Sequence, residues 1–273
     1  MLLLGLGLAF WLAIFPFYTW VPLLTGESQP YIAGFLFSLL PTVVFFLMLN
    51  FLDAFAFLRN SPVFFQGLQL AGTIMVATAG IWAAFQRDLT RLFGYAVIQE
   101  TGFALLAISL HSETGLALFA AGLVPRQIGF GLFALSLSVM QSRNVSLRFE
   151  DEGLAFRQVP IASLASLVAI FSISGLPLLA GFPVRQPLLE ELGAGSIAVA
   201  IWALIGSAGM MYGGLRYLSA LFRREPPTGQ SGEGWYQIAL LSAGVVMLFV
   251  AGVFPTPTIS MMLNVLSGFA NLF

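Results

Sequence analysis

Three charged residues lie inside apolar stretches of this 273-residue chain, and their types could carry proton or ion chemistry. Glu100 lies in AVIQETGF, Arg126 in GLVPRQIGF and Arg185 in GFPVRQ. A carboxylate can take up and release a proton, whereas an arginine stays protonated and holds anions. A charge at a bilayer centre costs about 2.5–3.5 kcal/mol on the insertion scale, so these side chains need partners. The residue types predict a Glu100–Arg126 pair or a Glu100–Arg126–Arg185 cluster.

Such a cluster has three interpretations. It is a static ion pair that keeps helices in register, a remnant hydrophilic half-channel in which Glu100 titrates, or a contact for a lipid or quinone headgroup. Asp53 is the fourth ionisable residue near membrane depth. Because it lies near the end of an apolar run, we expect it at the membrane interface.

The composition identifies the elements that must position these charges. The chain is 59% hydrophobic and 8% charged, which excludes a soluble globular domain and indicates an all-α integral membrane protein. A net charge of −1 argues against nucleic-acid binding. Without cysteine and with His111 as the single histidine, we expect no metal site in this chain. The N-terminus has no basic region of the signal-peptide type, so we expect it to stay attached.

About eight apolar stretches are long enough to cross a bilayer as helices. They cover residues 1–24, 31–55, 67–85, 92–110, 115–140, 160–192, 195–221 and 235–254. The tail 256–273 is apolar but short, and Pro255 and Pro257 separate it from the last span. We expect this tail to lie at the interface.

The positions of the arginines predict which side of the membrane each loop faces. With eight spans, loops 86–91, 141–159 and 222–234 lie on one side of the membrane. They carry Arg87, Arg91, Arg143, Arg148, Arg157, Arg223 and Arg224, whereas the opposite side has only Arg59. The positive-inside rule places those three loops in the cytoplasm and both termini outside.

Two spans contain residues that interrupt helices. FPFYTWVPL (15–23) has prolines on both sides of its aromatic residues, at what the sequence suggests is the exit of the first span. The stretch 160–192 is too long for one straight crossing, and we expect a broken helix at Gly175, Pro177, Gly181 and Pro183. Discontinuous helices often mark ion or substrate paths, although kinks without a function are an alternative.

Three motifs in order resemble one known family. PFYTWVP resembles the PFHxWLP element of the antiporter-like subunits of complex I (NADH–quinone oxidoreductase), membrane-bound hydrogenases and multisubunit sodium/proton antiporters. QRDLTRLFGYAVIQETGF (86–103) is similar to DxKRLLAYSSIxHxGY, and SISGLPLLAGFPVRQ (172–186) to SLAGIPPxAGFxGKF. The resemblance is greatest to the quinone-side member of the complex I set. The shared residues, which we expect to be structural, are Pro16, Phe17, Trp20, Pro22, Asp88, Arg91, Tyr95, Gly102, Ser172, Gly175, Pro177 and Gly181.

The resemblance implies a domain organisation. Family members have about fourteen helices built from two inverted five-helix repeats, and this chain resembles their C-terminal part. It implies a remnant of the first repeat at 1–55, a complete second repeat at 67–221, and a terminal span with its tail at 235–273. The remaining helices are then either lost or supplied by a separate chain.

The departures from the family concern its lysines. The resemblance assigns proton transfer to lysines in the membrane, and their positions correspond here to Trp11, Pro41 and Arg185. All 11 basic residues of this chain are arginine. A buried lysine can load and unload a proton because burial lowers its pKa, whereas arginine remains charged. The family's titratable residue in the second motif corresponds to Glu100.

We therefore expect a non-catalytic membrane-arm subunit of a complex I-like oxidoreductase or related energy-converting complex, with proton translocation residual or lost. The alternatives are a purely structural scaffold subunit and an independent transporter for ions or inorganic carbon. The resemblance implies no cofactor in this chain, with any NADH, flavin, iron–sulfur centre or quinone bound by partner subunits. It implies other membrane subunits and lipids as partners, in a bacterial-type inner or energy-transducing membrane.

Overall fold

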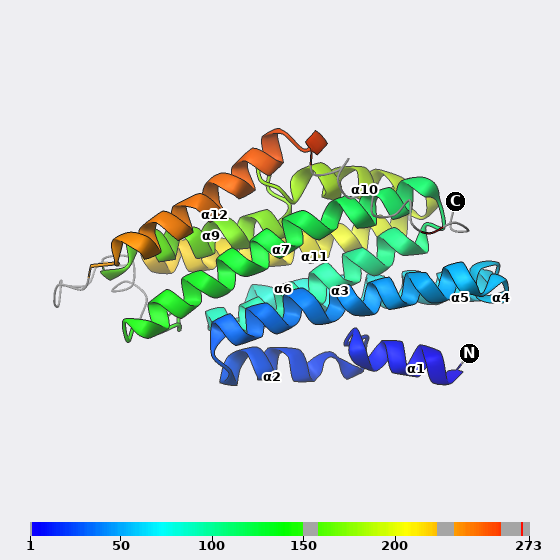
Figure 1. The fold of residues 1–273 in the computed structure, drawn as a ribbon, viewed down its shortest axis with the longest axis horizontal. Coiled ribbons are helices and arrows are strands. Elements are labelled where there is room, and N and C mark those ends of the chain that lie inside the picture. The colour runs from blue at the N-terminus through cyan, green and yellow to red at the C-terminus, as the bar shows by residue number, and fades with distance from the viewer. Residues whose placement is uncertain (1, 150–157, 223–231, 258–268, 270–273) are drawn as a thin grey trace.

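The protein forms a bundle of long helices, most of which run along one common direction (Figure 1). The computed structural model describes residues 2–149, 158–222, 232–257 and 269. Within these ranges the regular secondary structure is helical, apart from one isolated antiparallel bridge between Asp88 and Arg148. The expected all-α membrane fold is confirmed.

Six helices are long and apolar enough to cross a bilayer. They are α3 (Pro30–Ala54), α5 (Pro62–Phe85), α6 (Leu89–Ser109), α7 (Glu113–Ser142), α11 (Ile197–Leu221) and α12 (Trp235–Val253). The shorter elements are α1 (Leu2–Trp11), the 3-10 turn η1 (Phe17–Thr19), α2 (Trp20–Glu27), α4 (Ala56–Arg59), α9 (Pro160–Ser174) and α10 (Phe182–Gly195).

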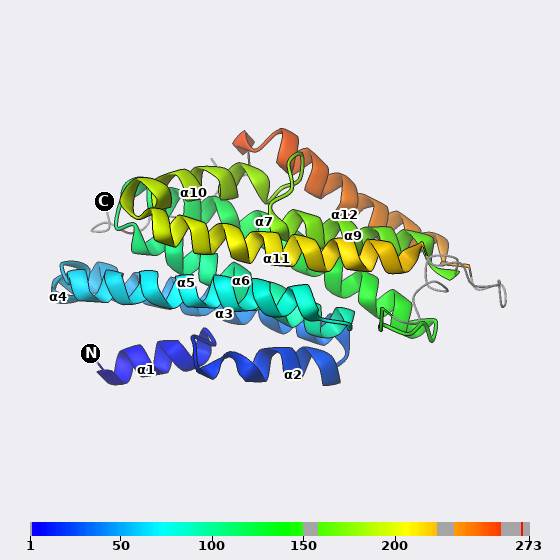
Figure 2. The same ribbon diagram turned by 180° about the vertical axis from the view of Figure 1, so that it is seen from behind.

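The shorter helices complete two further crossings. Helices α1 and α2 follow one another beneath α3, and α9 and α10 follow one another along α11 (Figures 1 and 2). Among the described residues the structure thus has six candidate spans and two pairs of shorter helices, and these pairs lie where the other two of the eight expected spans were placed.

The break in the first crossing lies elsewhere than the sequence suggested. Residues 12–19 separate α1 from α2, so the corner at Pro16 lies within the crossing and not at its exit. Pro16 lacks the N–H that a continuing helix needs. Pro22, by contrast, lies within the first turn of α2, where a missing N–H costs little. Only one of the two prolines therefore interrupts the helix.

The break in the second crossing is confirmed between Gly175 and Gly181. Gly175 ends α9 in the left-handed region at φ 84°. The N–H of Gly175 donates to the Ser172 carbonyl and that of Leu176 to the Phe171 carbonyl, which is a Schellman motif. Pro183 lies in the first turn of α10, where it begins the second half-helix instead of interrupting one.

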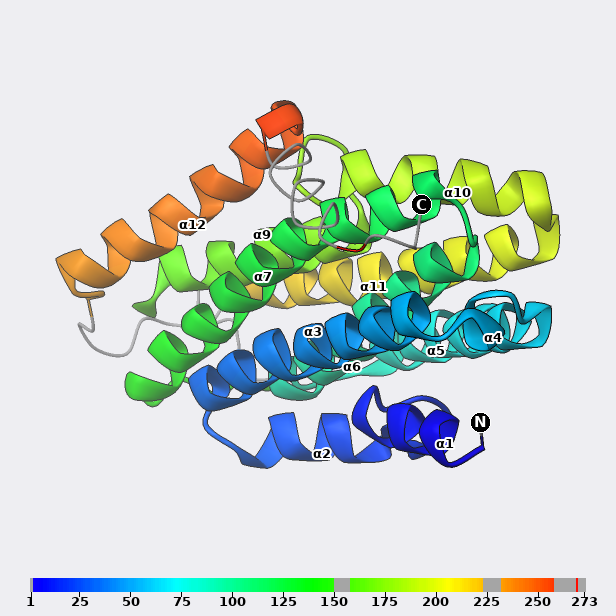
Figure 3. The ribbon, with the colours of Figure 1, turned by 45° about the vertical axis from the view of Figure 1, so that its right-hand side comes forward.

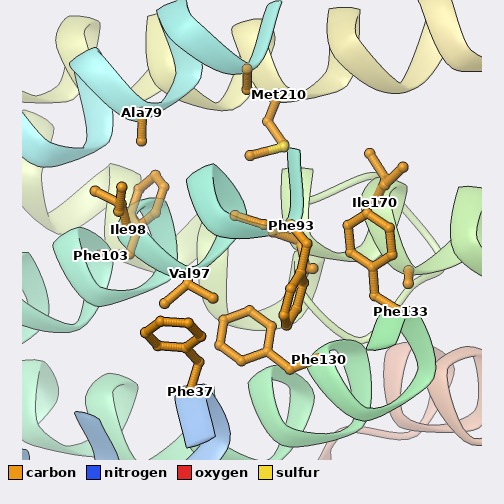
Figure 4. Packing of buried hydrophobic residues seen from close by; sticks show 14 of the residues in the cluster. Phe37, Ala79, Phe93, Val97, Ile98, Phe103, Phe130, Phe133, Ile170 and Met210 are labelled. Carbon is orange, nitrogen blue, oxygen red and sulfur yellow. The ribbon is translucent and has the colours of Figure 1, made fainter. Parts of the chain in front are cut away.

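Helix α6 is the most enclosed of the six continuous crossings. In its most apolar window 78% of the residues are buried, against 17% for α12. It packs against α2, α5 and α7 (Figure 3). Phe93 of α6 makes edge contacts with Phe130 and Phe133 of α7, with ring centroids 5.6 and 5.3 Å apart (Figure 4). The carboxylate of Glu100 thus belongs to the central helix.

Helices α5 and α11 approach each other through glycines. A Cβ on Gly80 would lie 2.1 Å from the carbonyl oxygen of Gly206, and a Cβ on Gly206 would lie 2.4 Å from that of Val76. Backbones this close leave no room for side chains, and small residues at such crossings are typical of helix packing in membranes.

The connecting residues 86–88 and 143–149 lie at one end of the bundle (left in Figure 1), where α5, α7 and α11 end and α6, α9 and α12 begin, whereas Arg59 of α4 lies at the other end. Arg157, Arg223, Arg224 and most of the tail 256–273 lie outside the described residues. At this end two main-chain hydrogen bonds join the connections. Leu89 donates to the Leu147 carbonyl, and Phe149 to the Arg87 carbonyl.

Candidate functional site

Glu100 of α6 and Arg185 of α10 form a buried ion pair next to the second helix break. The Arg185 Nη2 atom donates to Glu100 Oε1, and the two side chains are 7% and 15% exposed for Arg185 and Glu100, respectively. The same nitrogen donates to the Ile173 carbonyl at 2.6 Å. Ile173 lies in the last turn of α9, whose carbonyls have no partner inside the helix. Arg185 therefore compensates both a carboxylate and the end of a half-helix.

An aromatic ring completes the environment of this guanidinium. The Arg185 Cζ atom lies 3.5 Å from the centroid of the Phe103 ring, within the range of a cation–π contact. Phe103 is on α6, one turn after Glu100. The same helix thus provides both the anion and the ring that hold Arg185.

Arg126 of α7 lies near this pair but is held differently. Its Nη2 atom donates to the Thr101 hydroxyl at 3.3 Å, and its Cζ atom lies 5.7 Å from the Phe45 centroid and 5.3 Å from that of Phe130. Its Nε and Nη1 atoms are buried without a hydrogen-bond partner among the described residues. Glu100 and Arg185 are therefore in direct contact, whereas Arg126 contacts a hydroxyl and two aromatic rings.

All three charged residues line one cavity of about 50 Å³ between α6, α7 and α10. A cavity needs about 10–15 Å³ to hold a water molecule, so this one has room for a few. Arg185 also lines a second cavity of about 360 Å³, together with Gly175, Glu190 and Ser207. The Arg185 side chain thus lies between two cavities.

Two of the positions at which the resemblance predicts family lysines share a different cavity. Trp11 and Pro41 line a space of about 10 Å³ together with apolar side chains and Thr101. This volume is at the lower limit for a single water molecule. The hydroxyl of Thr101 donates to the Val97 carbonyl at 2.8 Å. No ionisable side chain lines this cavity in the described part of the chain.

The motif residues lie at helix ends and close crossings. The Asp88 carboxylate caps α6 by accepting from the N–H groups of Thr90 and Arg91, at 2.8 and 3.3 Å. Gly102 packs against α5, where a Cβ would lie 2.8 Å from Val76. The first break includes Pro16 and Phe17, and Trp20 and Pro22 start α2. Ser172 lies in the last turn of α9, and the second break includes Gly175, Pro177 and Gly181. Tyr95 is half-buried on α6.

A close backbone approach explains the glycine at 181. A Cβ there would lie 2.0 Å from the Ser172 carbonyl oxygen, so the returning chain touches the end of α9 directly. Any larger residue would push α10, and with it Arg185, away from the break.

Sequence reasoning missed several polar residues that secure the helices. Arg216 of α11 donates from Nη1 to the carbonyls of Ala84 and Gln86, at 2.7 and 3.0 Å, and so caps α5. Gln127 of α7 donates to the Ser38 carbonyl at 2.9 Å and the Thr42 hydroxyl at 2.8 Å, close to Pro41. Their acceptors are largely main-chain carbonyls, which leave no mark in a sequence. The only available signal was a polar residue within an apolar helix.

Asp53 lies in the last turn of α3 and is half-buried, and its main-chain carbonyl accepts from Arg59 at 3.1 Å. Among the residues that the structure describes, no three His, Cys, Asp or Glu side chains gather as metal ligands would.

Comparison with known proteins places the chain in a family. Residues 1–211 match the family model described as "NADH:quinone oxidoreductase/Mrp antiporter, TM". The chain is 29% identical over 279 aligned positions to NADH-quinone oxidoreductase subunit N of Ectopseudomonas mendocina, an alignment covering 95% of this chain and 54% of the relative. It is 31% identical over 248 positions to NADH-quinone oxidoreductase subunit 14 of Thermus thermophilus, covering 90% and 55%. The chain therefore spans about half the length of the curated relatives it matches.

A solved structure shares the fold. The chain superimposes on a chain of the membrane-bound sulfane sulfur reductase, described as an archaeal respiratory membrane complex, with a TM-score of 0.89 at 20% identity, covering 97% of this chain and 55% of that one. The chain belongs to the NADH:quinone oxidoreductase/Mrp antiporter transmembrane family.

Proposed function

We propose that this chain is an antiporter-like membrane subunit of a complex I-like or related energy-converting complex, in which proton transfer through the chain is residual or lost. The observation that carries the proposal is the Glu100–Arg185 pair. A carboxylate that exchanges protons needs a partner whose interaction can change, but an arginine stays protonated at any physiological pH. The pair therefore gives Glu100 a permanently charged partner, which favours a structural contact over a proton relay.

The relatives support the assignment to a complex. Those compared are NADH-quinone oxidoreductase subunits, and the solved structure is a respiratory membrane complex. By this proposal the chain binds no redox cofactor itself, and any NADH, flavin, iron–sulfur centre or quinone is bound by partner subunits. Its arginine-bearing loops face the cytoplasm of a bacterial-type inner membrane.

The first experiment tests the assignment to a complex. The protein would be purified from its native membrane in mild detergent through a tag, and the whole assembly weighed by native mass spectrometry. The expected result is co-purification with other antiporter-like or redox subunits in fixed stoichiometry. A chain that runs alone would overturn the proposal and point to an independent transporter.

A second experiment tests proton transfer. Glu100→Gln would be compared with Glu27→Gln, which removes an exposed carboxylate at the end of α2. The readouts are the electron-transfer rate and the protons moved per electron in membrane vesicles. If transfer is residual, only Glu100→Gln lowers the proton ratio, and it does so without slowing electron transfer in proportion.

A purely structural subunit is the second candidate. It is favoured by the small apolar cavity where the family lysines would lie, lined by Trp11 and Pro41. In that case Glu100→Gln lowers the stability of the complex while the proton ratio of the intact fraction equals that of the wild type.

A further inference from the structure

A cavity of about 180 Å³ lies at the end of the bundle opposite the connecting residues 86–88 and 143–149. Helices α3 and α6 end there, at Ala54 and Ser109, and α5 and α7 begin there, at Pro62 and Glu113 (Figure 1). Because four long apolar helices end or begin around it, the cavity lies at the boundary between the bilayer and water. It is separate from the Glu100–Arg185 site.

The polar wall of this cavity carries both signs of charge. Arg59, His111, Ser112 and Glu113 all line it. One Arg59 donor is committed to the Asp53 carbonyl at 3.1 Å, out of the five that a guanidinium has. The Ser112 hydroxyl accepts from the Gly115 N–H at 3.0 Å, which leaves its own hydrogen to donate. Arginine, imidazole and hydroxyl are donors to an anion, whereas the Glu113 carboxylate accepts only.

The position of His111 is fixed by its backbone and by a ring contact. Its φ of 49° is in the left-handed region, which is uncommon for a residue other than glycine. Its ring stacks on Phe65 with centroids 4.0 Å apart and planes 17° apart. Stacking covers one face of the imidazole, so its nitrogens are left to bond at the ring edge.

The remaining wall of the cavity is apolar. Leu52, Ile108 and Leu116 complete the lining. In the chain segment that carries Arg59 and Phe65, Phe57 and Val63 are 61% and 75% exposed, as expected for side chains that face acyl chains. The volume is below the about 300–1,000 Å³ of sites for drug-sized ligands and suits a headgroup.

We propose that this cavity binds the phosphoethanolamine headgroup of a phospholipid. The phosphate would accept from Arg59, His111 and Ser112, and the primary ammonium would donate to Glu113. The zwitterion matches the charges of the wall, since one arginine and one glutamate sum to zero. A phosphatidylglycerol headgroup brings no cation for Glu113. A phosphatidylcholine headgroup brings a cation without N–H donors.

The proposal is independent of any role in proton transfer, because it needs only membrane insertion. It is tested by native mass spectrometry of the delipidated protein, in its purified complex, titrated separately with phosphatidylethanolamine, phosphatidylcholine and phosphatidylglycerol of identical acyl chains. We expect the first bound phosphatidylethanolamine to be held about tenfold more tightly than either of the other lipids, as one charge-assisted hydrogen bond would give.

Two variants test the binding of the phosphate and of the ammonium separately. Arg59→Gln should weaken phosphatidylethanolamine and phosphatidylglycerol together, by about tenfold. Glu113→Gln should remove the preference for phosphatidylethanolamine and improve phosphatidylglycerol binding. Matched controls are Arg148→Gln and Glu27→Gln, which remove exposed charges elsewhere in the chain and should leave the lipid preference unchanged.

Equal affinities of the wild type for the three lipids would overturn the proposal. A second result would also overturn it. This is a Glu113→Gln variant that elutes and melts like the wild type and still keeps the full preference for phosphatidylethanolamine. Should Arg59→Gln fail to fold, the Glu113→Gln result alone decides.

Discussion

The Glu100 carboxylate on α6 and the Arg185 guanidinium on α10 meet inside the bundle although 85 positions separate them in the chain. The contact exists because the second crossing is broken, which places the start of α10 beside the end of α9. Arg185 then reaches Glu100 and the Ile173 carbonyl with one nitrogen. The break and the ion pair therefore depend on each other.

The first prediction concerns the energy of this pair. Glu100→Gln and Arg185→Gln should each lower the free energy of unfolding by about 3 kcal/mol, because each leaves a buried partner uncompensated. The double variant should lose clearly less than the sum. Unfolding in mixed micelles, followed by tryptophan fluorescence, measures all three. Strict additivity would show that the two side chains do not interact.

The second prediction contrasts the two buried arginines. Arg126→Met should change the free energy of unfolding by less than about 1 kcal/mol, because it removes a cation that has no carboxylate bonded to it. Arg185→Met should cost about 3 kcal/mol, since it strands Glu100. The thermal midpoints of the two purified variants give the comparison. Equal losses would mean that Arg126 also compensates a buried anion.

The third prediction concerns the apolar cavity at Pro41. Pro41→Lys should destabilise the protein by about 2–3 kcal/mol, because the small cavity is lined by no anion that could pair with the ammonium. Pro41→Leu should be neutral or stabilising, as it restores a helical N–H. The two variants share a position and differ in charge. Comparable melting temperatures would show that this region is hydrated.

The fourth prediction concerns the crossing of α5 and α11. Gly206→Ala should cost about 1–3 kcal/mol, since its methyl group would collide with the Val76 carbonyl. Gly131→Ala on α7 is the control, because a Cβ there meets nothing within 4 Å. That change should be neutral or stabilising by up to about 1 kcal/mol. Calorimetry of the two variants tests the difference, and a Gly206→Ala as stable as its control contradicts the packing.

The sequence predicted the crossings better than the contacts between them. Apolar length and the Gly175–Pro177–Gly181 spacing were enough to predict eight spans and the second break. The first break was misplaced, since an apolar composition does not show where a crossing begins. Hydropathy records burial in lipid, but not the depth of a given residue.

Only part of the candidate site could be predicted from the sequence. Glu100 and Arg185 could be selected because a charge in an apolar stretch is conspicuous, and the structure pairs them. The orientation of Arg126 toward Thr101, Phe45 and Phe130 depends on how α7 is rotated against α3 and α6. That rotation is set by packing over the whole helix. The part of Glu100, Arg126 and Arg185 in proton transfer stays a proposal.

The place of Arg185 between two cavities has a consequence for permeation. A cation passing from the space beside Gly175 and Ser207 to the space beside Arg126 would have to move past a fixed guanidinium. Arginine at a constriction is an electrostatic barrier to protons and other cations in membrane channels. The ion pair that holds the broken helix together thus also keeps a fixed guanidinium between the two cavities.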